Sequence, residues 1–143
     1  MTTPAACELC SSDGGQVLWR HARARVVLVE DPLHPVFCRV IWHQHVKEMT
    51  DLDPAAAQWL LAVVLGTERA MRDTVQIDKI NLASLGNMTP HLHWHVIGRF
   101  ANDPHFPVPV WAPARHARPQ ALPDGWQAAL AAALAQRLAA LVA

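Results

Sequence analysis

Short stretches in which apolar and polar residues alternate occupy the first third of the chain and recur near its middle. Alternation of this kind, combined with β-branched and aromatic residues, is typical of half-buried β-strands. The pattern predicts strands at Gln16–Arg20, Ala24–Val29, Phe37–Trp42 and Lys79–Ala83, and the first two are close enough to form a hairpin. The fourth leads into a further alternating segment, so we expect an antiparallel sheet.

The pattern changes to helical spacing between Pro54 and about Thr74, where apolar residues recur every three or four positions. Asp53 is a natural N-cap, and a proline at the first helical position loses no hydrogen bond. A second helix is predicted over Asp124–Val142, which is rich in alanine and leucine and has Asp124 as its cap. The expected fold is α+β: an antiparallel sheet with one main helix and a C-terminal helix.

The segment between the last strand and this second helix contains prolines too often for regular structure. We therefore divide the chain into a catalytic domain over residues 1–103 and an appended part over residues 104–143. The appended part consists of a proline-rich arm and the C-terminal helix, packed on the same domain or on a partner subunit. His105 and His116, which lie on the arm, are expected to be exposed to solvent. The prolines are Pro104, Pro107, Pro109, Pro113, Pro119 and Pro123.

Three histidines, His91, His93 and His95, alternate with large apolar residues in the alternating segment. On a strand such histidines share one face, while the apolar residues share the other. Imidazole can act near neutral pH as nucleophile, general base, general acid or metal ligand, so this row indicates chemistry more than packing. The spacing leaves open a zinc-dependent hydrolase in which the three histidines hold a catalytic metal.

Composition narrows the remaining classes of function. The chain has 143 residues, enough for one domain, with 12 basic and 12 acidic side chains. This balance provides no general attraction to nucleic acid or to a membrane surface, and we expect neither as a partner. The sequence shows no apolar run of transmembrane length and no secretory signal, so we expect a cytoplasmic protein with reduced or metal-bound cysteines.

The pattern His91-x-His93-x-His95 followed by two apolar residues resembles the signature of the histidine triad (HIT) family of nucleotide hydrolases and nucleotidyl transferases. The strand around Asn81, the turn at Gly86-Asn87 and the upstream pair His45-Val46 occupy comparable places in that family. The resemblance covers roughly residues 7–99. It is stronger to bacterial members with an N-terminal Cys-x-x-Cys than to the fragile histidine triad branch, and it implies a HIT-like fold and a homodimer.

The resemblance also implies a mechanism at the α-phosphate of a nucleoside 5′-phosphate derivative, with a purine nucleotide as the expected partner. His93 would attack the phosphorus and form a covalent nucleotidyl-histidine, which water then hydrolyses. His95 would donate to a phosphate oxygen and assist the leaving group, and His91 would orient its neighbours. No catalytic metal is required. A protein of this fold that binds a nucleotide without turnover is a further alternative.

Four residues are assigned to substrate binding through the resemblance: Asn81, Asn87, Thr89 and Asp31. Asn87 stands where many members have glutamine, and Asp31 lies where a carboxylate can bind ribose hydroxyls, although a turn also explains an aspartate before proline. Met88 replaces the serine of the phosphoramidase branch, and its thioether cannot protonate an amine. Phe37 takes the place of a glycine or histidine that often lines the pocket.

The pair Cys7-x-x-Cys10 is a weak metal signal when taken by itself, because structural zinc needs four ligands. Similar bacterial HIT proteins complete such a site with two histidines, which correspond here to His45 and His91. Thiolate and imidazole ligands suit Zn²⁺, and a site with four protein ligands is closed and structural. His43 is the rival to His45, but its place in the alternation puts it on a different face.

Overall fold

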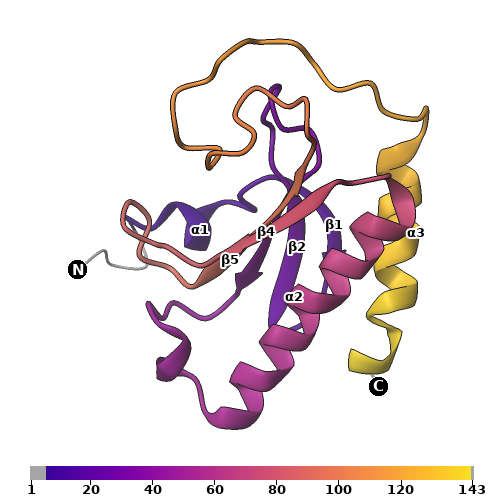
Figure 1. Cartoon of the computed structure of the whole chain (residues 1–143). Helices are drawn as coiled ribbons and strands as arrows, with labels where there is room; N and C mark the ends of the chain where they lie inside the picture. Colours follow the sequence, from indigo (N-terminus) through magenta and orange to yellow (C-terminus); the bar gives the residue numbers. More distant parts are fainter. Residues whose placement is uncertain (1–5, 143) are drawn as a thin grey trace.

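Five antiparallel strands form one sheet in the computed structural model, which describes residues 6–142. The strand order is β1-β2-β3-β5-β4, so β3 and β5 lie inside the sheet and β4 lies at an edge (Figure 1). The predicted hairpin and the pairing of the fourth strand with the histidine strand are both confirmed. The strands are β1 (Gln16–Arg20), β2 (Ala24–Leu28), β3 (Phe37–Trp42), β4 (Lys79–Ala83) and β5 (His93–Arg99).

The main helix α2 (Pro54–Thr74) covers one face of the sheet and has the predicted cap. The Asp53 carboxylate accepts a hydrogen bond from the amide of Ala56 at 2.9 Å. Helix α3 (Trp126–Arg137) lies beside α2 on the same face (Figure 1). The two packing surfaces approach closely, since a Cβ on Gly66 would come within 2.4 Å of the Leu138 side chain.

The C-terminal helix is shorter than expected, and its cap is a different residue. Gly125 precedes it with φ at +72°, a left-handed conformation that glycine adopts without strain, and Asp124 does not serve as the cap. The chain continues from α3 into a single 3₁₀ turn, η3 (Ala139–Leu141). Over residues 6–142, every helix is too short or too polar to cross a bilayer.

Two short helices, α1 (Glu8–Ser11) and η2 (Met49–Asp51), were not predicted. Helix α1 lies over the face of the sheet opposite α2, where Leu9 packs against Val27 and Ile41. The guanidinium of Arg25 fastens this N-terminal segment by donating to the carbonyls of Leu9, Ser12 and Asp13 at 2.8, 3.0 and 2.9 Å.

The proline-rich arm leaves β5 and runs in a wide loop past the ends of the strands before it reaches α3 (Figure 1). A buried ion pair holds its start, because Arg99 donates to both carboxylate oxygens of Asp103 at 2.8 and 3.1 Å. His105 is only 4% exposed, so its expected exposure is wrong. Its Nδ1 lies 2.7 Å from Nε2 of His34, and this buried contact ties the arm to the loop before β3.

Candidate functional site

The candidate site lies on the face of the sheet opposite α2. In β5, His93 and His95 point to this face, whereas Val96 belongs to the core beneath α2. In the neighbouring strand β3, Ile41 lies opposite His93 and Arg39 lies opposite His95. Cross-strand partners share a face, so an arginine side chain lies beside the histidine pair.

His91 lies two residues before the start of β5 at His93. The backbone of Leu92 bonds to the ends of two segments: its amide donates to Val46 and its carbonyl accepts from Trp42. The His91 ring faces the N-terminal segment, near the sulfurs of Cys7 and Cys10, and is 1% exposed. His93 and His95 share one face of β5, and His91 lies just before the strand with its ring beside the two cysteines.

Hydrogen bonding assigns the tautomer of His93. Its Nδ1 lies 2.6 Å from the carbonyl oxygen of His91, and a carbonyl can only accept, so Nδ1 carries the hydrogen. A neutral ring then has its lone pair on Nε2. Burial lowers the pKa of His93, against the opposite effect of the His91 carbonyl, and favours this neutral form.

His95 is neutral for the same main reason. Burial, followed by the influence of His93 and Arg39, lowers the pKa of His95 to about 4. Its Nδ1 is buried without a hydrogen-bond partner among the described residues, which assigns the hydrogen to Nε2, since a buried orphan N–H is the costlier choice. His95 can therefore donate a hydrogen bond, but it brings no positive charge to the site at neutral pH.

Two aromatic residues enclose His95. Phe37, from the start of β3, meets its ring edge to face with centroids 5.5 Å apart. Trp111, from the arm, does the same at 5.3 Å while leaving 55% of its own surface exposed. The ring of His93 completes the set at 5.0 Å. The arm thus forms one wall of the site, a role that the proline-rich sequence did not indicate for Trp111.

The side chains of Asn81 and Asp31, two of the four residues assigned to substrate binding, have local structural partners. Asn81 accepts a hydrogen bond from Arg99 at 2.8 Å, and the Asp31 carboxylate accepts from the amides of Leu33 and His34 at 2.9 and 3.2 Å. Asn87 is exposed in the turn before β5, while the carbonyl of Thr89 accepts from the amide of His91 at 2.8 Å. Their roles in substrate binding stay predictions.

The four predicted metal ligands come together beside α1. Nδ1 of His91 lies 3.4 Å from the sulfur of Cys7 and 3.5 Å from that of Cys10. Nδ1 of His45 lies 3.3 Å from the Cys10 sulfur and 3.3 Å from Nδ1 of His91. His43 points elsewhere, with its ring against the carbonyl of Ala22 at 3.1 Å.

These separations fit a tetrahedral zinc ion. Bonds of about 2.3 Å to sulfur and about 2.0 Å to nitrogen imply roughly 3.6 Å between sulfur and nitrogen and roughly 3.3 Å between two nitrogens. The other ring nitrogen of His91 lies 2.5 Å from the carbonyl of Trp42, which fixes Nδ1 as the coordinating atom. The cluster is therefore compatible with structural zinc.

A second group of potential ligands, His34, Asp103 and His105, has ligand atoms within 4.8 Å of one another. Asp103 is already saturated, since it accepts from Arg99 and from the backbone amides of Phe100, His105 and Phe106. A cation would have to compete with the Arg99 guanidinium for this carboxylate. The group therefore serves to hold the arm.

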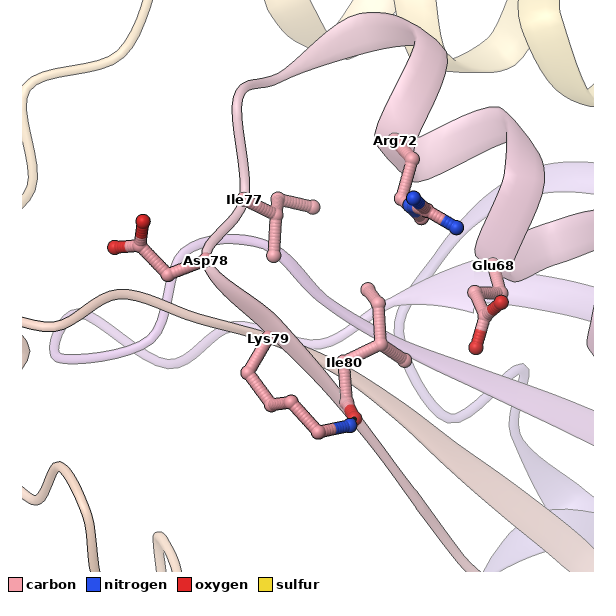
Figure 2. A pocket seen from close by; sticks show the side chains of 6 residues that line it. All are labelled: Glu68, Arg72, Ile77, Asp78, Lys79 and Ile80. Atoms are coloured by element: carbon pink, nitrogen blue, oxygen red, sulfur yellow. Dashed lines mark hydrogen bonds between the residues drawn. The ribbon is translucent and has the colours of Figure 1, made fainter.

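A pocket between α2 and β4 is separate from the histidines (Figure 2). In Figure 2 the Lys79 ammonium folds back onto the backbone, where it donates to the carbonyl of Ile80 at 2.6 Å. No candidate site residue contributes to the lining, which consists of Glu68, Arg72, Ile77, Asp78, Lys79 and Ile80.

Arg39 was missed from the sequence. It is a charged residue inside an otherwise apolar strand, Phe37–Trp42, and that interruption was the available signal. Its Nη1 donates to the carbonyl of Gly14 at 3.2 Å, while its Nε is buried without a partner among the described residues.

Comparison with known proteins agrees with this geometry. A histidine triad protein from Marinobacter aquaeolei has 29% identity over 90% of this chain and 92% of its own, with a TM-score of 0.70. A histidine triad protein from Bradyrhizobium japonicum has 25% identity over 87% of this chain and 91% of its own, also with a TM-score of 0.70. A zinc-bound histidine triad family protein from Mycobacterium smegmatis shares the fold. It has 23% identity over 96% of this chain and 99% of its own, with a TM-score of 0.68.

Comparison with proteins of curated function gave no match. The family model described as the HIT domain matches residues 13–102, which include β1 to β5, α2 and the histidine pair. The chain therefore belongs to the histidine triad (HIT) family.

Proposed function

We propose that the protein is a nucleotide hydrolase or nucleotidyl transferase that acts at the α-phosphate of a nucleoside 5′-phosphate derivative, and that His93 is its nucleophile. Family membership supports the class of reaction. The observation that carries the assignment of the nucleophile is the hydrogen bond from His93 Nδ1 to the His91 carbonyl at 2.6 Å. It holds the hydrogen on one nitrogen and keeps the lone pair on the other.

In the first step, Nε2 of His93 attacks the α-phosphorus and a P–N bond forms as the bond to the leaving group breaks. The ring becomes cationic, and its Nδ1–H stays on the His91 carbonyl, where the added charge strengthens the hydrogen bond. Water then attacks the same phosphorus and releases a proton to solvent, the P–N bond breaks, and neutral His93 is restored. His95 donates its Nε2–H to a non-bridging oxygen as charge builds there.

Zinc in this proposal is structural and is held by Cys7, Cys10, His45 and His91. When bound, it cross-links the N-terminal segment to the loop that enters β5, and its binding energy contributes to folding. A catalytic metal held by the three histidines is disfavoured by the contacts of His91. One ring nitrogen faces the two cysteines, and the other faces the Trp42 carbonyl.

We also propose that the protein is a homodimer, as the family resemblance implies. Leucine side chains remain exposed on the outer surface of α2, with Leu61 at 40% and Leu65 at 43%. Leu82, at 39% exposure, lies on the edge strand β4. Light scattering after size-exclusion chromatography tests this, because a mass near 15.8 kDa would identify a monomer.

Intact-mass measurement after rapid mixing with an adenylyl substrate tests the nucleophile. Wild-type protein should gain the mass of one adenylyl group under quenching without acid, and His93→Ala should gain none while keeping its circular dichroism spectrum. His116→Ala, on the arm, is the matched control and should label like wild type. Adduct on His93→Ala would overturn the assignment, and nucleotide binding with no adduct on wild type would identify a binding protein.

A further inference from the structure

We propose that Arg39 binds a phosphate oxygen of the substrate and is the residue by which the site recognises an anion. The inference deepens the proposed function and rests on it for the identity of the ligand as a nucleotide. It concerns a residue of β3, opposite the histidines in the sheet register rather than within the triad.

The position of Arg39 is fixed by strand geometry. Arg39 pairs with His95 across β3 and β5, and its neighbours Cys38 and Val40 point to the core beneath α2. Its side chain therefore emerges on the histidine face. The electrostatic effect of Arg39 also contributes to the lowered pKa of both His93 and His95, as expected for a cation close to both rings.

Arg39 has hydrogen-bonding capacity that the protein leaves unused. A guanidinium has five N–H donors. Arg39 uses one in the bond to Gly14, its buried Nε has no partner, and it forms no ion pair with any described carboxylate. A buried N–H of a cation without an acceptor is unfavourable unless a ligand supplies one.

Among the described residues, neither Arg25 nor Arg99 has a buried N–H without an acceptor. Arg25 donates to three backbone carbonyls of the N-terminal segment, which accounts for it as a structural residue. Arg99 is paired with Asp103 and also donates to Asn81 and to the carbonyl of Val108. Both guanidinium groups have their acceptors within the protein. Arg39 has one bond to Gly14 and a buried Nε–H with no acceptor among the described residues.

The charge balance of the site also favours a role for Arg39 in binding phosphate. A phosphate group entering a site of low dielectric needs a compensating positive charge, and the attacking histidine must be neutral. Burial keeps His95 neutral, so it offers a hydrogen bond without a charge. Arg39 supplies the missing charge, and its planar fork suits the spacing of two phosphate oxygens.

Calorimetric titration of the purified full chain with AMP and with adenosine tests the proposal. Arg39→Gln should raise the Kd for AMP by about tenfold or more, because it removes a charge-assisted bond, while the Kd for adenosine changes little. Arg39→Lys keeps the charge but loses the planar fork, so its Kd for AMP should lie between those of wild type and Arg39→Gln. Arg20→Gln removes an exposed cation paired with Asp13 and should bind AMP like wild type.

If Arg39→Gln raises the Kd for AMP and the Kd for adenosine equally, or raises neither, the proposal is overturned. Arg39 would then serve only to anchor the Gly14 loop. A parallel titration with ADP locates the contact. An equal rise in the Kd for AMP and for ADP places it at the α-phosphate, and a larger rise for ADP than for AMP extends it to the next phosphate along.

The wild-type protein gives a test that does not depend on the folding of the glutamine variant. The ¹⁵N-labelled Arg39 Nε–H resonance, assigned by its disappearance in Arg39→Lys, should shift on addition of AMP and not of adenosine. An unchanged resonance at saturating AMP contradicts the proposal. These outcomes are independent of adduct formation, so a protein that binds AMP through Arg39 without labelling His93 would refute the proposed reaction and leave this inference standing.

Discussion

The imidazole of His93 donates from Nδ1 to the backbone carbonyl of His91, at 2.6 Å. The ring of His91 lies in turn within the Cys7, Cys10 and His45 cluster. One residue therefore links the candidate nucleophile, through its backbone, to the candidate zinc site, through its side chain. We therefore expect ordering of the N-terminal segment to affect ordering of the nucleophile, although the metal ligands take no part in the proposed chemical step.

The first prediction concerns this coupling. The double variant Cys7→Ser/Cys10→Ser should lose about one zinc ion per chain and melt at a lower temperature, because metal binding contributes to folding. Activity should fall only moderately, since His93 keeps its place on β5. Elemental analysis and calorimetry measure the two effects. Cys38→Ala, which alters a fully buried core cysteine, is the control and should keep its zinc.

The second prediction separates structural from catalytic metal. A brief exposure to EDTA, or addition of Mg²⁺, should leave the rate of the chemical step nearly unchanged, because both ring nitrogens of His91 face groups outside the pair His93 and His95. Single-turnover kinetics within the first minutes after chelation measure this. Immediate loss of activity that Zn²⁺ restores, with an unchanged circular dichroism spectrum, would favour the metallohydrolase alternative.

Local sequence signals were enough to predict the strands and the main helix. The apolar and β-branched run over Phe37–Trp42 and the cap formed by Asp53 depend on neighbours in the chain, and both predictions are confirmed. The gathering of Cys7, Cys10, His45 and His91 followed from the family resemblance, because residues 84 positions apart carry no local sign of contact.

Features that depend on distant partners could not be predicted in the same way. The strand begins only at His93, and the backbone of Leu92 just before it bonds to both Trp42 and Val46, which lie about 50 residues earlier in the chain. The exposure of His105 was mispredicted because a proline-rich composition does not reveal that Asp103, two residues earlier, is buried against Arg99. Helix α1 has four residues, too few for a periodic pattern.

The third prediction concerns the attachment of the arm. The side chains of Arg99 and Asp103 are 3% and 0% exposed, so Asp103→Asn leaves a buried guanidinium without its counter-charge. Loss of one partner of a buried pair costs on the order of 3–5 kcal/mol of unfolding free energy. Urea unfolding monitored by circular dichroism measures the cost. Asp73→Asn breaks the exposed pair with Arg137 and should cost far less, about 1 kcal/mol at most.

Trp111 gives this variant a second readout. The arm carries Trp111 against His95, so release of the arm should separate the indole from that ring and change its emission in a chain in which the other five tryptophans are substituted by phenylalanine. An Asp103→Asn variant as stable as wild type, with unchanged emission, would contradict the view that this ion pair holds the arm.

The last prediction is a dependence of stability on pH that arises from His34. Burial lowers the pKa of His34 from 6.5, and His105 and Arg99 act in the same direction, while the carboxylates of Asp103 and Asp31 oppose them. The unfolded chain therefore binds more protons than the folded protein between the lowered pKa and 6.5. The contribution of His34 to the free energy of unfolding is therefore largest above pH 6.5, and it decreases as the pH falls through this window.

His34→Asn removes this titration and with it the contact to His105. The variant should be less stable than wild type at pH 8, and the difference should shrink as the pH falls, by at most about 1.4 kcal/mol per pH unit for one proton. Urea unfolding at pH 8, 6.5 and 5.5 measures both curves, with zinc content checked at each pH.

His43, His91, His93 and His95 also have lowered pKa values, so the wild-type stability falls further than His34 alone explains. Only the difference between the two proteins isolates His34, and parallel curves would show that His34 takes up its proton equally in the folded and unfolded states.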